Sequence, residues 1–175
     1  MERVRERLLY IIPLTIMSIA LLLYLNFRRF TDILLLLGGL PFALVGGLLF
    51  VSCLQFKLSV AVIVGFIALA GLSVETGALM LQVLRTQVNL GIGLSAWALR
   101  QQIVDAAGQR LRPVLMTAIA TIAGLLPVMF GSGPGSELMS RIAAPVIGGL
   151  VSSVILTLIV LPAAFYLVVR REEAV

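Results

Sequence analysis

One carboxylate stands inside an otherwise apolar run of the sequence. Glu75 lies in the segment LAGLSVETGALM, which covers residues 69–80. An ionised carboxylate at the centre of a bilayer costs at least about 2.5–3.5 kcal/mol, so it is expected to face a protein interior and to have a partner or a proton. Loss of water makes a carboxylate hold its proton more strongly. Glu75 is therefore predicted to be either a proton carrier or a permanently protonated hydrogen-bond donor to a neighbouring helix.

The composition excludes several other kinds of chemistry. The 175 residues include no histidine and one cysteine, Cys53, so histidine-based catalytic triads, histidine metal sites and an intrachain disulfide are excluded. Hydrophobic residues make up 61% of the chain and charged residues only 12%, against about 25% charged in soluble domains. The chain is predicted to be a membrane protein that is not an enzyme and has no cofactor.

The element that must position Glu75 is one of five apolar stretches long enough to cross a bilayer, which takes about 20 helical residues. The five expected spans cover about residues 8–27, 33–54, 58–84, 113–130 and 142–169. Pro113 is expected to open the fourth span, and the glycine-rich residues 131–135 to close it. The residues from about 94 to 107 have helical periodicity and predict a surface helix. This helix either lies on the membrane surface or is a solvated connector without lipid contact. The fold class is therefore an all-α membrane protein, a five-helix bundle forming a single transmembrane domain over 1–175.

The cationic residues predict an orientation. With five spans, one side receives eight arginines and the other receives five cationic residues. The eight are Arg28, Arg29, Arg85, Arg100, Arg110, Arg112, Arg170 and Arg171; the five are Arg3, Arg5, Arg7, Lys57 and Arg141. Because cytoplasmic loops carry the excess of Lys and Arg, the C-terminus is expected in the cytoplasm and the N-terminus outside. The same assignment explains the net charge of +5 without a nucleic-acid partner.

Small residues at four-residue spacing mark three helix faces that allow close packing in lipid. The faces are Ala144, Gly148 and Ser152; Ala61 and Gly65; and Ala120 and Gly124. They predict helix contacts rather than chemistry, and a surplus of such faces also fits a bundle that packs against further helices.

Several longer runs resemble the resistance-nodulation-division efflux permeases, specifically their heavy-metal branch. The matching runs are YLNFRRFTD, LPFALVGG, LSVAVIVGFIALAGLSVETGALML, RLRPVLMTAIATIAGLLPVMFGSGPGSELMSRIAAPVIGG and LPAAFYL. The resemblance implies a bacterial inner-membrane location, and that the chain corresponds to helices eight to twelve of a twelve-helix, proton-driven exporter of copper, silver, zinc, cobalt or cadmium. It also implies that this chain lacks the first repeat, the seventh helix and both periplasmic domains of such an exporter.

The resemblance also assigns roles to individual residues. Glu75 lies where the heavy-metal branch has the glutamate of its proton relay, and Arg110 and Thr117 are similar to polar relay residues, with Thr117 available to hydrogen-bond Glu75. Val114 departs from the lysine of copper and silver members. Met139 resembles a methionine of the thioether path for soft monovalent metal ions, or is simply an apolar residue at a helix mouth. Glu137, Asp32 and Asp105 are expected to be solvated caps or loop charges.

The predicted function is thus the C-terminal membrane part of a metal-cation exporter, unable to transport alone. Its expected partners are the lipid bilayer, the missing half or a full-length permease, and by resemblance a homotrimer with a periplasmic adaptor and an outer-membrane channel. The alternatives are a non-transporting protein that packs against or regulates a complete permease, and a truncation remnant without function.

Overall fold

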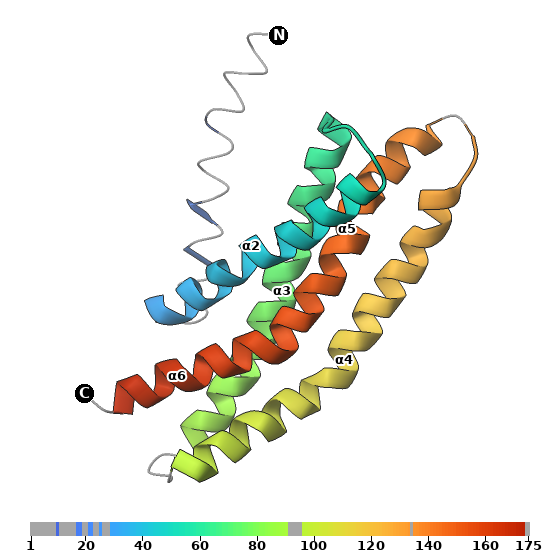
Figure 1. Cartoon of the computed structure of the whole chain (residues 1–175). Helices are drawn as coiled ribbons and strands as arrows, with labels where there is room; N and C mark the ends of the chain where they lie inside the picture. Colours follow the sequence, from blue (N-terminus) through green and yellow to red (C-terminus); the bar gives the residue numbers. More distant parts are fainter. Residues whose placement is uncertain are drawn as a thin grey trace. The chain divides into compact units, whose positions relative to one another are not determined.

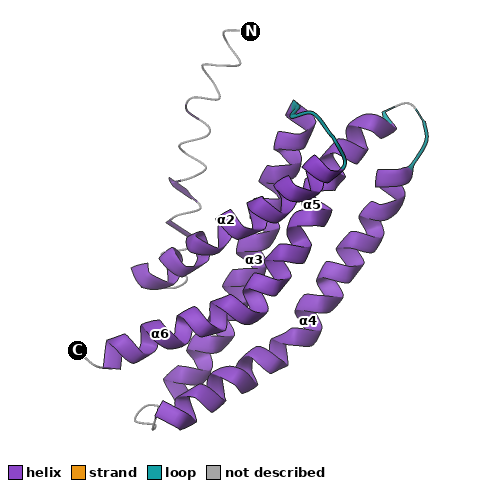
Figure 2. Cartoon of the chain, in the orientation of Figure 1, coloured by secondary structure: helices purple, strands orange, loops and turns teal. Residues whose placement is uncertain are grey.

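The structure, a computed structural model, describes residues 29–90, 96–133 and 135–173, together with residues 10, 17, 18, 21, 22 and 25. The elements named along these residues are all helices (Figures 1 and 2). Contacts within the chain divide it into two units, Met1–Leu34 and Leu35–Val175. The second unit contains most of α2 and every later helix.

The first two long helices agree closely with the second and third predicted spans. Helix α2 covers Phe30–Cys53 and helix α3 covers Val60–Leu90. Helix α3 continues six residues beyond the expected end because no glycine or proline interrupts the polar residues after Leu84. Near that end, the guanidinium of Arg85 lies 5.0 Å from the centre of the Phe165 ring, a cation–π distance. With bounds at Val60 and Leu90, helix α3 has Glu75 at its midpoint.

Helix α4 differs from the sequence-based expectation. We expected a surface helix at about 94–107 and a separate span opened by Pro113, but Ala96–Phe130 form one helix of 35 residues with Pro113 inside it. A proline inside a membrane helix is tolerated where local adjustments and neighbouring helices satisfy the freed backbone groups, and it bends the helix. Figure 1 shows α4 bending near its middle. The expected connector is thus the first part of α4.

The last predicted span is a single helical run with a π segment inside it. Helix α5 covers Ser136–Ile155, the π segment η1 covers Leu156–Val160, and α6 covers Leu161–Glu173. Pro162 is the second residue of α6, two residues after the end of the π segment. A proline has no N–H and its ring clashes with the carbonyl four residues earlier, so it accounts for the wider turn at this point. The run bends there (Figure 1).

Two of the three small-residue faces are packed as predicted. A Cβ atom on Gly65 would lie 2.4 Å from the backbone oxygen of Ile142, so α3 and α5 touch here backbone to backbone. A Cβ on Gly148 would lie 2.2 Å from the Cβ of Phe50, which brings α5 equally close to α2. The third face stays open within the described part of the chain, because Ala120 and Gly124 are exposed and nothing lies within 4 Å of a Cβ on Gly124.

Four helical stretches are long and apolar enough to cross a membrane among the described residues. They are Phe30–Cys53, Val60–Val88, Trp97–Phe130 and Ser136–Arg170. The expected first span, at about 8–27, lies almost entirely outside the described residues. The all-helical membrane fold predicted from the sequence is confirmed for the part of the chain that the structure covers. Two boundaries differ from the prediction: α3 ends at Leu90, and α4 begins at Ala96.

Candidate functional site

A cleft of about 290 Å³ lies between the middle parts of α3 and α4 and the C-terminal end of α5. Helix α3 contributes Glu75 and Thr76, α4 contributes Arg110 and Thr117, and α5 contributes Ser153, with apolar residues between them. The three residues assigned to a proton relay by resemblance therefore line one cleft, which we call the Glu75 cleft. They reach it from two helices that are separated in sequence by the α3–α4 connection.

The position of Glu75 differs from the expectation in one respect. The residue was expected to face the bundle interior, but its side chain is exposed in this chain. Glu75 is the middle residue of the 31-residue helix α3, so in a helix that spans the membrane it is expected near the bilayer centre. A carboxylate exposed to lipid at that depth is costly. The open side of the cleft is therefore expected to be covered by protein or water rather than by lipid.

Thr117 does not make the hydrogen bond that the sequence suggested. Its hydroxyl donates to backbone oxygens of its own helix, 3.1 Å from Pro113 O and 3.0 Å from Val114 O. Such back-bonding is a local alternative to an interhelical bond. Thr117 thus lines the same cleft as Glu75, but its hydroxyl hydrogen is donated to the backbone of α4. Val114, the departure from the lysine of copper and silver members, is buried at 6% exposure and also lines the cleft.

A polar contact next to the cleft was missed by the sequence analysis. The hydroxyl of Ser153 on α5 donates to the hydroxyl oxygen of Ser73 on α3 at 2.9 Å, and both residues are buried. One turn beyond Ser153, Thr157 is 1% exposed and its hydroxyl oxygen has no partner within the described structure. Single hydroxyl residues are common in membrane helices, so only the hydrogen bond between α3 and α5 distinguishes Ser73 and Ser153. They extend the polar lining from Glu75 into the α3–α5 interface.

Met139 lies away from the Glu75 cleft. It is 53% exposed in the first turn of α5, where its N–H donates to Gly135 O at 3.1 Å. Ser153, which lines the cleft, follows 14 residues later on the same helix, which corresponds to about 21 Å along the axis. Among the described residues, no three His, Cys, Asp or Glu side chains gather around a common point. Met139 therefore lies at the N-terminal end of α5, apart from the Glu75 cleft.

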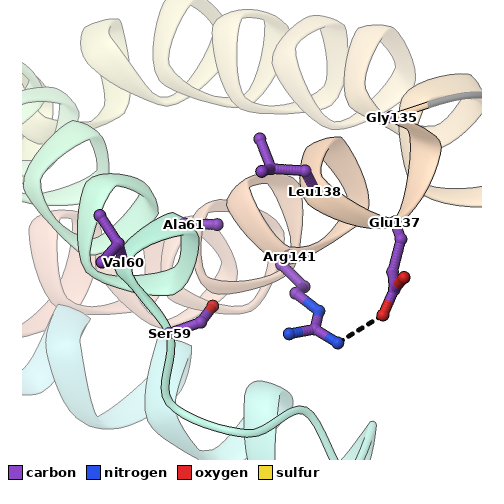
Figure 3. A pocket seen from close by; sticks show the side chains of 7 residues that line it. All are labelled: Ser59, Val60, Ala61, Gly135, Glu137, Leu138 and Arg141. Carbon is purple, nitrogen blue, oxygen red and sulfur yellow. Dashed lines mark hydrogen bonds and ion pairs between the residues drawn. The ribbon is translucent and has the colours of Figure 1, made fainter.

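Next to Met139, a separate pocket of about 390 Å³ lies at the same end of α5. Figure 3 shows its lining from the starts of α3 and α5, with Glu137 paired to Arg141 on the outer side. This pair is partly exposed, at 80% for Glu137 and 31% for Arg141, and exposed pairs of this kind stabilise little. The Oγ of Ser59 and the Nε of Arg141 are buried without a hydrogen-bond partner in the described structure. Glu137 is thus a surface charge, as expected.

The two remaining acids divide. Asp105 is exposed on α4 and lies 3.5 Å from the Nε2 of Gln101, so it is a solvated helix charge rather than a loop charge. Asp32 was expected to be solvated, but it is only 1% exposed in the first turn of α2. A carboxylate in the first turn interacts favourably with the positive end of the helix dipole, and this interaction stabilises Asp32 at the start of α2.

The chain is similar in sequence to a known protein family and to several curated proteins. A model of the AcrB/AcrD/AcrF family matches residues 1–170. The chain is 45% identical to the cation efflux system protein SilA of Salmonella typhimurium over 99% of its length, and 44% identical to the cation efflux system protein CusA of Escherichia coli K12 over 95%. It is 38% identical to the cobalt-zinc-cadmium resistance protein CzcA of Cupriavidus metallidurans over 99%.

A solved structure shows the same helical arrangement. The crystal structure of a heavy metal efflux pump in crystal form II superposes with a TM-score of 0.78 and 35% identity, covering 95% of this chain and 16% of that one. The chain likewise spans only 16–17% of the length of the three curated relatives. The similarity therefore concerns one membrane segment of much longer proteins.

Proposed function

Because this chain belongs to the AcrB/AcrD/AcrF family of resistance-nodulation-division permeases, in its heavy-metal efflux branch, we propose that it is the C-terminal membrane portion of a proton-driven exporter of metal cations. In this role it is a transporter component of the bacterial inner membrane and not an enzyme. Its N-terminus is proposed to lie in the periplasm and its C-terminus in the cytoplasm.

The single observation that carries this proposal is the Glu75 cleft. A carboxylate at the midpoint of a spanning helix, exposed on one side and flanked by Arg110 and Thr117, is a functional arrangement by default because its cost must be offset. Glu75 changes its charge by binding one proton, and Arg110 lines the same cleft with a permanent positive charge. Uptake of a proton at Glu75 therefore changes the net charge of the cleft lining. That change gives proton entry a means of altering how α3 packs against α4.

The open side of the cleft supports the second half of the proposal, that the chain works with further helices. Glu75 is exposed, and Ala120 and Gly124 leave a small-residue face of α4 unpacked in the described structure. Small-residue faces associate with other helices in lipid, and transporters of this kind work by moving one repeat against another around a central site. We propose that the companion helices come from the other repeat of a permease, and that the assembled pump is a homotrimer with a periplasmic adaptor and an outer-membrane channel.

The metal is proposed to be the transported substrate and not a resident cofactor. Met139 offers one thioether, which suits copper(I) or silver(I), but Val114 replaces the lysine expected in exporters of those metals. Zinc, cobalt and cadmium therefore remain in the proposed substrate class, and the CzcA relative carries these three metals in its name.

A chimera tests the proposal directly. The segment of E. coli CusA that matches this chain is replaced by residues 1–175, and the chimera is placed in proteoliposomes with copper(I), silver(I), zinc(II), cobalt(II) or cadmium(II) in turn. Metal flux that depends on an imposed pH gradient is expected for at least one metal. An assembled chimera that moves none of the five metals, or moves one at the same rate without a pH gradient, contradicts the proposal.

A further inference from the structure

A second cleft, of about 610 Å³, lies between α4 and the η1–α6 run, on a different part of the second unit from the Glu75 cleft. We call it the α4–α6 cleft. Its walls are apolar, with Ile103 and Val104 on α4 and Ile159 and Leu167 on the opposite run. Of the residues that line it, only Arg100 and Tyr166 have polar groups on their side chains. The cleft is thus an apolar surface with one cationic and one phenolic side chain.

These two polar residues are equally far, counted in residues, from the connection between α4 and α5. Helices α4 and α5 are joined by the short connection between Phe130 and Ser136, so α4 and the α5–η1–α6 run are antiparallel. Arg100 comes 30 residues before Phe130, and Tyr166 comes 30 residues after Ser136. In the same way Ala107 and Ile159 are each 23 residues from the connection. The cleft therefore has a polar end formed by Arg100 and Tyr166 and an apolar end closer to the connection.

The depths compare well with a bilayer. A rise of 1.5 Å per residue places the polar end about 45 Å along the helices from the connection, and the apolar end about 34 Å. The hydrocarbon core is about 30 Å thick, and about 40–45 Å with both headgroup regions. Helix tilt and the bends in both runs shorten these distances along the membrane normal. On this basis we place the apolar end of the cleft at the edge of the hydrocarbon core and the polar end among the headgroups.

From this arrangement we propose that the α4–α6 cleft binds one anionic phospholipid of the leaflet on the C-terminal side. The phosphate accepts charge-assisted hydrogen bonds from the guanidinium of Arg100, the hydroxyl of Tyr166 lies at the level of the glycerol esters, and an acyl chain follows Ile103, Val104 and Ile159. Trp97, 75% exposed one turn before Arg100, is a residue type enriched at the membrane–water interface. The proposal concerns lipid alone and does not depend on the transport function.

The charges favour a lipid over a second copy of the chain. Arg170, one turn beyond Tyr166 on α6, is exposed like Arg100, so this end of the cleft region carries positive charge from both helices. Two identical chains that met here would bring these arginines together, and like charges repel. An anionic headgroup complements them, and basic groups beside membrane helices attract anionic lipids.

Native mass spectrometry of the full chain, released from detergent micelles, tests the proposal. The chain is titrated with phosphatidylglycerol and, separately, with phosphatidylcholine of the same acyl chains. Both lipids have a phosphate that can accept from Arg100, but the choline ammonium cancels the net charge of phosphatidylcholine. Because Arg100 and Arg170 attract a net anionic headgroup, phosphatidylglycerol is expected to bind about tenfold or more tightly than phosphatidylcholine. Arg100→Gln is expected to remove this preference.

The matched control is Arg112→Gln, which removes an exposed arginine from the same helix but outside the cleft, and it is expected to keep the preference. Ala163→Phe places a ring in the cleft and is expected to weaken binding of both lipids. Far-UV circular dichroism confirms that each variant keeps its helices.

Three results would overturn the proposal. Equal binding of the two lipids by the unaltered chain would show that the cleft does not select an anionic headgroup. An equal loss in Arg100→Gln and Arg112→Gln would reduce it to general charge attraction. Chain dimers that Ala163→Phe dissociates, with lipid binding unchanged, would assign the cleft to a second copy.

Discussion

The close contact of α3 with α5 at Gly65 makes a sharp stability prediction, since any side chain there meets backbone. A Cβ atom on Gly65 would lie 2.4 Å from Ile142 O and 2.5 Å from the Cγ of Pro145. Neither a backbone oxygen nor a proline ring can move aside by changing a rotamer. Gly65→Ala must therefore push the two helices apart along the interface that positions Ser153 opposite Ser73.

A second glycine of α3 supplies the matched control. Gly71 is exposed, and nothing lies within 4 Å of a Cβ built on it. Both substitutions bring the same gain in helix propensity, about 1 kcal/mol, so this contribution cancels when the variants are compared. Overpacking of a tight contact costs about 1–3 kcal/mol. Gly65→Ala is thus expected to be about 1–3 kcal/mol less stable than Gly71→Ala.

The assay is reversible unfolding of the chain in mixed micelles, followed by circular dichroism as the fraction of denaturing detergent rises. Gly71→Ala is expected to unfold at the same or a higher fraction than the unaltered chain, and Gly65→Ala at a lower one. If the two variants unfold within about 0.5 kcal/mol of each other, a margin typical of neutral substitutions, the contact between α3 and α5 at Gly65 is not close and the reasoning is refuted.

Three further predictions follow from the remaining elements. Reporter domains fused after Gln55 and Ser132 are expected to give periplasmic signals and a fusion at Val175 a cytoplasmic one; a periplasmic signal at Val175 would reverse the orientation drawn from the arginines. Ser73→Ala and Ser153→Ala are each expected to lower stability, and the double variant to lose about 0.6 kcal/mol less than their sum, a typical coupling for a hydrogen bond between membrane helices; strict additivity would mean that the two hydroxyls do not interact. Proteoliposomes that contain only the 175-residue chain are expected to show no metal flux above empty vesicles under a pH gradient, and saturable flux that follows the gradient would make the chain a transporter by itself.

The sequence predicted most of the fold because membrane helices are defined by length and apolarity, both of which are visible without tertiary information. It failed at α4 because a proline is compatible both with the first turn of a helix and with the interior of a bent one. The residues before Pro113 were polar enough to suggest a separate surface helix. Only the observed continuity from Ala96 to Phe130 decides between the two.

For the candidate site, the sequence identified residue types but not their contacts. Glu75 was recognised from its charge in an apolar run, and the resemblance added Arg110 and Thr117, all of which line one cleft. The bond between Ser73 and Ser153 was not foreseen because it depends on the relative rotation of two helices. The roles of Glu75, Arg110, Thr117 and Met139 in transport stay predictions.

The most direct measurement of the central claim is proton-coupled metal flux by the chimera with Glu75 changed. Glu75→Gln keeps the size and hydrogen-bonding ability of the side chain but cannot gain or lose a proton, while Asp105→Asn makes the same kind of change at an exposed carboxylate outside the Glu75 cleft. We predict that Glu75→Gln abolishes gradient-driven flux in an assembled chimera and that Asp105→Asn leaves it intact. Gradient-driven flux that survives Glu75→Gln would contradict the account and leave Glu75 as a structural hydrogen-bond donor.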